Sequence, residues 1–466
     1  MKKVLKSVVA VVLCLAMVLS LAACGPKYTN GVNTDEFTDK ATGVTYKGRI
    51  KIGAAISRTG PYALVGEPYG GFYDLYVRYI NEVLGGVAKT SDEGALGYKL
   101  EATTYDDAGD GAQGLSYIQK LVEDDGVFAL VGNLGTWNIV ASQDYIEESG
   151  VPSVYWGTGS SYQYFNPAVG NEKYTFPVQP IYNTEGRIMY LRAMQLAGLE
   201  GSGINVGGVN SIGVIHSSSD DGASIKAGIE EQRNINLKTD ANQPTVVYAQ
   251  MNSTSATELT AQVETIKNCD VVIIAGNQTY FQAAYNAMQT ANVRKPVITS
   301  YVNIAPAAVP NEATKAEASD IYGGAWVIID DSADERQHAD LLRFIAICKW
   351  GVEKGIISQS VADSYMMSAY AMSSFIALDV FMTGINRLAD KEITRENLLE
   401  AMESAPINVP ISGGVNYANG QRIGLDGMSF VKYVRPSDPK AAASTGTFTN
   451  VINMQSIDEI LGELSE

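Results

Sequence analysis

Histidine and cysteine are scarce in this chain, and its negative charges outnumber its positive ones. Two histidines and four cysteines in 466 residues are too few for a zinc framework or a disulfide scaffold. Lys and Arg number 34 against 51 Asp and Glu, which gives a net charge of -17. Because such a chain repels a phosphate backbone, we expect no nucleic-acid partner. We also expect no metal and no cofactor.

Long apolar runs and catalytic motifs are also missing beyond the N-terminal region. The most apolar later stretch, residues 366–385, is interrupted by serines and by Asp379, so it predicts a buried or amphipathic helix. The chain has no G-x-S-x-G, H-E-x-x-H or P-loop motif. Neither His216 nor His338 has a partner at catalytic or metal-binding spacing. We therefore expect a protein that is not an enzyme.

The first 24 residues predict export. Lys2, Lys3 and Lys6 precede an apolar stretch over residues 8–19, which has the length of a signal-peptide core. The following Leu-Ala-Ala-Cys, ending at Cys24, resembles the lipobox of bacterial lipoproteins. This resemblance implies a signal peptide over residues 1–23 and a lipid on Cys24, which would anchor the protein on the extracytoplasmic face of the cell membrane. The alternative is an ordinary cleaved signal peptide with an incidental cysteine.

Residues 24–47 are rich in Gly, Thr, Asn, Asp and Lys and have no hydrophobic period, so we expect a flexible tether. Strand and helix patterns alternate from there on. Pro68 is predicted to begin the first helix, which runs to Asn81. Two series of such units predict an α/β fold with two parallel sheets flanked by helices. The expected strands cover residues 50–56, 99–105, 128–131 and 152–156 in the first series, and 211–215, 245–249, 271–275 and 296–299 in the second.

Function is expected in the loops that follow the strands, because ligands of parallel sheets bind beyond the carboxyl ends of their strands. The loops of the first series are Ser-Arg-Thr-Gly-Pro-Tyr from Ser57, Tyr-Asp-Asp-Ala-Gly-Asp from Tyr105, Gly-Asn-Leu-Gly-Thr-Trp from Gly132, and Gly-Thr-Gly-Ser-Ser from Gly157. In this order they resemble the type I periplasmic binding proteins, specifically the branched-chain amino-acid-binding (leucine-binding-like) lipoproteins of ABC transporters. The resemblance extends from about Gly48 to about Tyr433.

That resemblance implies two Rossmann-like lobes joined by three crossing segments and closing on a small ligand. Lobe 1 would comprise residues 48–178 and 328–408, and lobe 2 residues 179–327 and 409–452. The implied function is capture of a small amino acid or related carboxylate and its delivery to an ABC permease by a monomer. Two alternatives remain open, a ligand-sensing receptor subunit and a binder of an aromatic or amide compound.

In the family, the loop matched by Gly135, Thr136 and Trp137 holds the ligand carboxylate with a hydroxyl and with backbone N–H groups at a helix N-terminus. Thr136 can supply that hydroxyl, and the helix dipole favours an anion there. Alternatively, Thr136 is a plain N-cap. Trp137 either forms a wall of the pocket or packs against its own helix.

The loop matched by Gly157, Thr158 and Ser160 offers a backbone carbonyl and a threonine to the ligand in relatives. Here Gly157 stands where the carbonyl is needed, but Gly159 stands where the threonine should be, so Thr158 or Ser160 would have to compensate.

Four further residues complete the candidate site. Asp221 stands where relatives place a tyrosine, and either pairs with a ligand ammonium or caps a helix. Tyr301 stands where amino-acid binders place an acid. Compared with those proteins, the acid of this chain, Asp221, therefore stands in a different loop. Arg58 either meets a carboxylate or is a solvated loop residue. Tyr62 and Tyr301 belong to a group of aromatic residues at strand ends that could stack on a ligand.

Cys269 and Cys348 are the only cysteines outside residues 1–24. Both border apolar runs and predict buried thiols, with a disulfide between them as the alternative.

Overall fold

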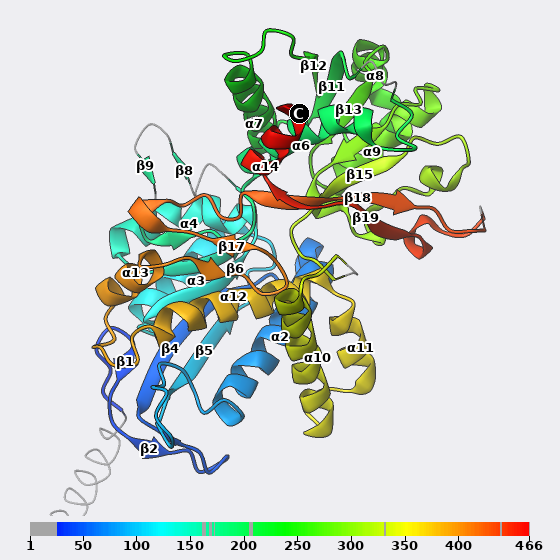
Figure 1. Ribbon diagram of the computed structural model, residues 1–466. Coiled ribbons are helices and arrows are strands. Elements are labelled where there is room, and N and C mark those ends of the chain that lie inside the picture. Colours follow the sequence, from blue (N-terminus) through cyan, green and yellow to red (C-terminus); the bar gives the residue numbers. More distant parts are fainter. Residues whose placement is uncertain are drawn as a thin grey trace, which may run out of the picture.

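The computed structural model of the chain describes residues 26–160, 165–166, 170–171, 173–204, 208–329, 332–438 and 440–465. Residues 1–25, and with them the predicted signal peptide and Cys24, lie outside the described residues. The chain forms two lobes, each built on one large sheet with helices packed against it (Figure 1).

The sheet of lobe 1 is parallel except at one short strand. Its parallel strands are, in spatial order, β5 (Tyr98–Tyr105), β4 (Gly48–Ala55), β6 (Ala129–Leu134), β7 (Ser153–Gly157) and β10 (Thr175–Phe176). The short β1 (Val32–Asn33) runs antiparallel beside the first residues of β4. The central strand β6 is buried along its whole length, as expected of a parallel strand covered on both faces.

Helices cover both faces of this sheet. The helices α3 (Gly111–Glu123) and α4 (Thr136–Ser149) pack on each other, and α2 (Ala63–Glu82) packs against α12 (Ala369–Asn386). The remaining helices of lobe 1 are α10 (Glu335–Glu353), α11 (Gln359–Met366) and α13 (Arg395–Glu403). The predicted start of the first helix at Pro68 is wrong, because α2 begins at Ala63 and carries Pro68 inside.

Lobe 2 holds a seven-stranded mixed sheet. Its parallel strands are, in order, β12 (Thr245–Gln250), β11 (Ser211–His216), β13 (Val271–Ala275), β14 (Val297–Thr299) and β15 (Ile321–Ala325), followed by the antiparallel β18 (Gly427–Val434) and β19 (Thr447–Ser456). Its helices are α6 (Tyr182–Gln195), α7 (Asp220–Asn236), α8 (Thr260–Ile266), α9 (Gln278–Thr290) and α14 (Ile457–Ser465). The predicted α/β fold with two sheet-based lobes is confirmed.

Three segments cross between the lobes, as expected. The first follows β10 over residues 177–181, and the second joins β15 to α10. Before the third crossing, β16 (Ile407–Asn408) and β17 (Gly414–Val415) form a hairpin, and β16 packs on α12 of lobe 1. The third crossing therefore begins after Val415, later than the predicted boundary at residue 408. Beyond residue 452 the chain continues into α14, which packs on α6.

Hydrogen bonds tie the crossings together. In the third crossing, the Leu425 amide donates to the Val178 carbonyl of the first (2.9 Å), and the Tyr417 hydroxyl donates to the Pro177 carbonyl (2.7 Å). Because these hydrogen bonds join the first crossing to the third, the two segments are expected to bend together.

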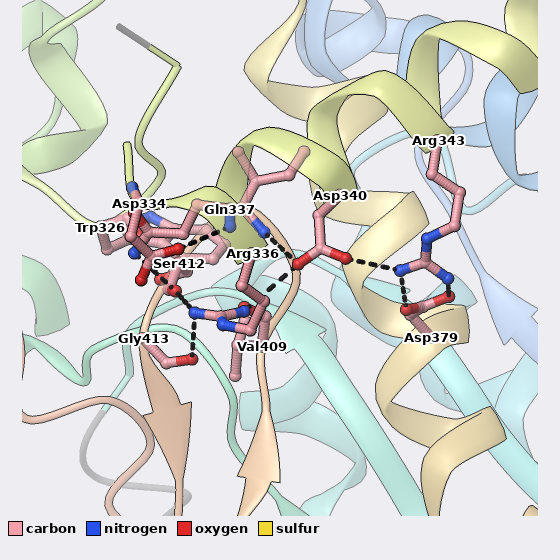
Figure 2. A network of polar contacts seen from close by, with 11 residues as sticks. Trp326, Asp334, Arg336, Gln337, Asp340, Arg343, Asp379, Val409, Ser412 and Gly413 are labelled. Atoms are coloured by element: carbon pink, nitrogen blue, oxygen red, sulfur yellow. Dashed lines mark hydrogen bonds and ion pairs between the residues drawn. The ribbon is translucent and has the colours of Figure 1, made fainter. Parts of the chain in front are cut away.

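The second crossing is fixed by a polar network at the start of α10 (Figure 2). Arg336 donates to the carbonyls of Val409 and Ser412 in the β16–β17 loop, and the Ser412 hydroxyl donates to the carbonyl of Trp326. Asp340 accepts from both Arg336 (3.2 Å) and Arg343 (3.0 Å). This network joins the second crossing to lobe 1 through α10.

Residues 28–46 differ from the flexible tether that we expected, because aromatic side chains pack them onto lobe 1. The ammonium of Lys51 lies 4.2 Å from the ring centroid of Tyr28. Tyr46 is fully buried and donates to the Asn81 carbonyl of α2 (2.9 Å). The hairpin of β2 (Phe37–Thr38) and β3 (Thr45–Tyr46) is held by an ion pair between Asp39 and Lys99 (2.5 Å). A further short ribbon is formed by β8 (Phe165–Asn166) and β9 (Gly170–Asn171).

No single described helix is long and apolar enough to cross a membrane; α11 and α12 together pass on length and composition, but are bent by 81° at their junction. Most of α12 is buried in the core of lobe 1, which matches the predicted buried helix in this region.

Candidate functional site

The carboxyl ends of the strands of both lobes meet at the boundary between the lobes. The amide of Tyr182, the first residue of α6, donates to the carbonyl of Gly159 in the loop after β7 (2.5 Å). A side-chain atom added to Gly159 would lie 2.3 Å from the Tyr301 hydroxyl of lobe 2. The two lobes are therefore tightly packed against each other near the first crossing.

Two hydroxyls from different loops meet in lobe 1. The Oγ1 atoms of Thr136 and Thr158 lie 2.6 Å apart, and Thr158 also accepts from the amide of Ser160 (3.2 Å). Thr158 is buried and Thr136 is half-buried. The two threonines thus form one polar spot between the ends of β6 and β7.

That polar spot lies at the N-terminus of α4. Gly135 is the N-cap with φ 97°, and no side chain caps the helix. The prediction that Thr136 serves as N-cap is therefore wrong, because Thr136 is the first residue inside the helix. An uncapped helix start offers unpaired backbone N–H groups and the positive end of the dipole, which suit an anion.

An aromatic pair stands beside this helix start. The rings of Tyr62 and Trp137 stack with centroids 3.9 Å apart and an interplanar angle of 13°. Tyr62 remains 41% exposed. A side chain at Gly135 would collide with the indole of Trp137 at 2.2 Å, so the absence of a Cβ there lets Trp137 fold back over its own loop. Trp137 therefore packs both against its own loop and against Tyr62.

Arg58 is paired away from the polar spot of lobe 1. Its guanidinium forms an ion pair with Asp74 of α2 (2.8 Å) and lies over Gly70 of the same helix. Arg58 is therefore held against α2 rather than solvated, while its role as a carboxylate ligand stays a prediction.

The acid pair after β5 has a structural role. The buried Asp107 accepts from the Ser57 hydroxyl and from the Asn138 amide (3.0 Å), so it joins the loops after β4 and β5 to α4. Burial raises the pKa of this carboxyl, while the bond from Ser57 opposes the shift. Asp106 binds the backbone and hydroxyl of Thr59.

On the lobe 2 side, Asp221 is held by hydroxyl groups. Its Oδ1 accepts from Ser217 (3.0 Å) and Ser219 (2.5 Å) and from the amide of Gly222. The N-cap of α7 is Ser219, so the N-cap interpretation of Asp221 is wrong. Asp221 is 8% exposed and lies in the first turn of α7, where the helix dipole stabilises an acid.

Tyr301 joins lobe 2 to the first crossing. Its hydroxyl donates to the Pro180 carbonyl (3.0 Å) and accepts from Gln179 (2.9 Å), whose amide oxygen in turn accepts from Tyr155 of β7 (2.9 Å). The Tyr301 ring stacks on that of Tyr182 at 6.0 Å. Burial raises the pKa of Tyr301 well above its usual value, so the hydroxyl stays protonated.

Sequence reasoning missed the acid nearest to Tyr301. Glu185 of α6 is fully buried and accepts from the Tyr301 amide (2.6 Å) and the Ser300 hydroxyl (2.9 Å). Burial raises the pKa of Glu185 to about 8, and the charge of Asp221 adds to the shift. The sequence alone predicts no site residue in the first crossing. An acid in the first turn of a helix that directly follows this crossing is the signal that could have revealed it.

Burial also raises the pKa of Asp220, the first residue of α7, whereas Ser160 and Ser224 oppose the shift. Together, Glu185, Asp220 and Asp221 supply three carboxyl groups to the lobe 2 side of the boundary.

Both remaining cysteines, Cys269 and Cys348, are free and buried, so the disulfide alternative is wrong and the prediction of buried thiols is confirmed. Across the described ranges, no group of three or more His, Cys, Asp or Glu residues is arranged to hold a metal ion.

Comparison with known proteins identifies relatives of this architecture. A profile described as "Periplasmic binding protein" matches residues 49–435. No curated protein matches the chain. A fatty acid ABC transporter substrate-binding protein from Thermomonospora curvata is 14% identical with a TM-score of 0.64, and the match covers 89% of this chain and 94% of that one. A branched chain amino acid ABC transporter protein from Thermus thermophilus with bound valine is 13% identical with a TM-score of 0.63, covering 90% and 99%.

Proposed function

Because the chain belongs to the periplasmic binding protein family, we propose that it captures a small amino acid or related carboxylate between its lobes and delivers it to an ABC importer. Members of this family bind substrates without transforming them, in keeping with the lack of catalytic motifs. Relatives differ in ligand, since one binds valine and another is a fatty acid transporter protein, so the ligand class has to be argued from this chain's own residues.

The observation that carries the proposal is the Thr136 and Thr158 hydroxyl pair at the uncapped start of α4. One hydroxyl proton is used between the two threonines, which leaves the other for a ligand oxygen. Together with the free N–H groups of the first helical turn, this arrangement suits a carboxylate. The Gly157 carbonyl and Ser160 are proposed as further contacts from the loop after β7.

Across the boundary, Asp221 and Glu185 are proposed to meet the ligand ammonium when the lobes close. A carboxylate subsite on one lobe and an acidic group on the other would make affinity depend on both ends of an amino acid. Binding would then favour the closed conformation, because only that conformation contacts both ends.

An aromatic acid is the second candidate ligand, and the stacked pair of Tyr62 and Trp137 supports it. The partly exposed Tyr62 ring offers an aromatic face beside the same helix start. The alternative to transport is a ligand-sensing role for the same two-lobed structure.

We further propose that the mature protein is a monomer anchored through lipid on Cys24 at the extracytoplasmic face of the membrane. The Leu-Ala-Ala-Cys sequence ending at Cys24 supports the anchor.

A thermal-shift screen of the mature chain tests the ligand class, since a ligand that binds the native state raises the melting temperature. The panel should contain amino acids, aromatic acids and uncharged amides. We expect carboxylates to raise the melting temperature. A shift with uncharged amides alone would overturn the carboxylate proposal.

A further inference from the structure

The first described part of the chain packs against lobe 1 on the side away from the boundary between the lobes. Within residues 27–46, β1 pairs with Arg49 and Ile50 at the beginning of β4, whereas β6 joins β4 only from Ile52 onwards. In Figure 1, β1 and β2 lie at the end of lobe 1 that is remote from lobe 2. The N-terminal segment, residues 27–46, therefore covers the amino ends of these strands, which we call the base of lobe 1.

Close contacts fix this segment to the base. The buried side-chain amide of Asn33 donates to the Lys27 carbonyl (2.9 Å), so the chain is held from Lys27 onwards. Gly31 has a φ of 79°, and a Cβ on it would lie only 2.2 Å from the backbone nitrogen of Phe128, just before β6. Only a residue without a side chain lets the backbone of the turn approach the sheet so closely. The segment is therefore part of the fold rather than a free linker.

The proposed lipid anchor, Cys24, stands only three residues before Lys27. A fully extended chain of three residues reaches at most about 11 Å. Lys27 is bound to Asn33, which lies beside Arg49, the second residue of β4. From Arg49 to the carboxyl end of β4 at Ala55, the strand rises by about 20 Å. The anchor is therefore too short to let the carboxyl ends of these strands face the bilayer.

Resting on the proposed lipid on Cys24, we infer that the base of lobe 1 faces the lipid bilayer in the membrane-bound protein, and that lobe 2 lies farthest from the membrane. Residues 27–47 contain three lysines and three acidic residues, so this stretch has no net charge with which to bind lipid headgroups. The short anchored chain, rather than electrostatic attraction, sets the orientation. This is the orientation of the protein while no permease is engaged.

Energy transfer from a dye on the protein to an acceptor in the lipid headgroups measures the orientation. The mature lipoprotein is placed in phosphatidylcholine vesicles and labelled at one introduced cysteine, since the two cysteines of the described fold are buried. S91C labels the loop before β5 at the base, L64C labels the exposed start of α2 near the boundary between the lobes, and A241C labels the exposed loop before β12 in lobe 2. We expect transfer to fall in that order and to be at least about twofold greater from S91C than from A241C, because β4 alone spans about 26 Å of the distance between these sites.

Lengthening the tether should abolish this ranking. Inserting about twenty Gly and Ser residues after Gly25 gives the anchor an r.m.s. reach of about 25 Å, which exceeds the rise of β4 beyond Arg49. Transfer from S91C should then fall towards that from A241C, although the contacts of the fold are unchanged.

A matched pair of glycine variants tests whether the packing of the segment is needed. G31A drives a Cβ into the backbone at Phe128, whereas Gly43 has a similar φ of 73° with nothing within 4 Å of an added Cβ. We expect G31A to release the segment and reduce transfer from S91C to near the A241C value, and G43A to keep the wild-type ranking. If G31A does not fold, the linker insertion still tests the inference.

The outcomes separate this inference from the proposed function. Equal transfer from S91C and A241C in vesicle-bound protein would overturn the inference and leave the anchor and ligand proposals standing. A ranking that appears only when phosphatidylglycerol is added would show charge-driven binding and would also overturn the inference. Protein that carries no lipid and does not bind the vesicles would overturn the anchor and the inference together.

Discussion

The hydroxyl oxygens of Thr136 and Thr158 lie 2.6 Å apart, although 22 residues separate them in the chain. One follows β6 and the other follows β7, and these adjacent parallel strands bring their carboxyl ends to the same edge of the sheet. The hydroxyl pair therefore depends on the sheet order, and it leaves one hydroxyl donor beside an uncapped helix start.

Replacing Thr136 by valine tests the hydroxyl directly. T136V keeps the shape of the side chain and removes one donor, so we expect affinity for the amino acid to fall about tenfold. Calorimetric titration measures the loss. T265V, which changes an exposed threonine on α8, is the control and should bind like the wild type. Equal affinity of T136V and wild type would exclude a ligand role for this hydroxyl.

A side chain in place of Gly135, in the loop before α4, is predicted to destabilise the protein. G135A combines a φ of 97° with a Cβ that would lie 2.2 Å from the Trp137 ring. We expect the free energy of unfolding to fall by about 1–3 kcal/mol. Urea denaturation measures this change. In contrast, G462A lies in α14 with open space around its Cβ and should stabilise the protein slightly. A G135A variant as stable as the wild type would contradict the packing described for Trp137.

The raised pKa of Glu185 predicts that the stability of the protein depends on pH. Its pKa is raised from 4.5 to about 8 by burial, so the folded state holds a proton that the unfolded state releases. Stability from this group is therefore complete below pH 4.5 and is lost as pH rises towards 8, by roughly 1.4 kcal/mol per pH unit at most.

E185Q should remove this dependence, because an amide does not titrate. Compared with the wild type, E185Q should be similarly stable near pH 5 and more stable near pH 8. Denaturation curves at both pH values give the difference, and E231Q controls for loss of an exposed charge. Parallel pH profiles for wild type and E185Q would show that Glu185 does not carry a raised pKa.

Cys24 is predicted to determine where the mature protein resides. The C24A variant should lack covalent lipid and leave the membrane fraction, whereas the wild type should partition into detergent. Metabolic labelling with a fatty acid followed by fractionation measures both. Lipid-free wild-type protein in the soluble fraction would favour the ordinary signal peptide instead.

Much of the fold could be predicted from the sequence, because buried parallel strands appear in it as short apolar runs. The expected strand 271–275 is the observed β13, and the other expected strands differ from the observed ones by a few residues at their ends. The predicted start of α2 is wrong, because Pro68 lies inside the helix rather than at its first position. The sequence does not predict the packed segment after Tyr28, because only a few aromatic side chains occur in an otherwise polar stretch.

The site was less predictable, because contacts between loops are not local. The sequence predicts both Thr136 and Thr158 as site residues, but their pairing follows from the sheet order. The ion pair of Arg58 with Asp74 spans 16 residues and depends on how α2 lies against its preceding loop. The sequence pattern of α6 does not indicate that Glu185 binds the buried turn at Ser300 and Tyr301.

The central claim, that the start of α4 holds a ligand carboxylate, is tested most directly by titrating one amino acid and its carboxamide. The pair should be the amino acid that raises the melting temperature most and the same molecule with its carboxylate converted to an amide. We predict that the carboxamide binds about a hundredfold more weakly, because it loses the negative charge that the helix start and the threonine hydroxyls favour. Equal affinity for the two compounds would contradict the account.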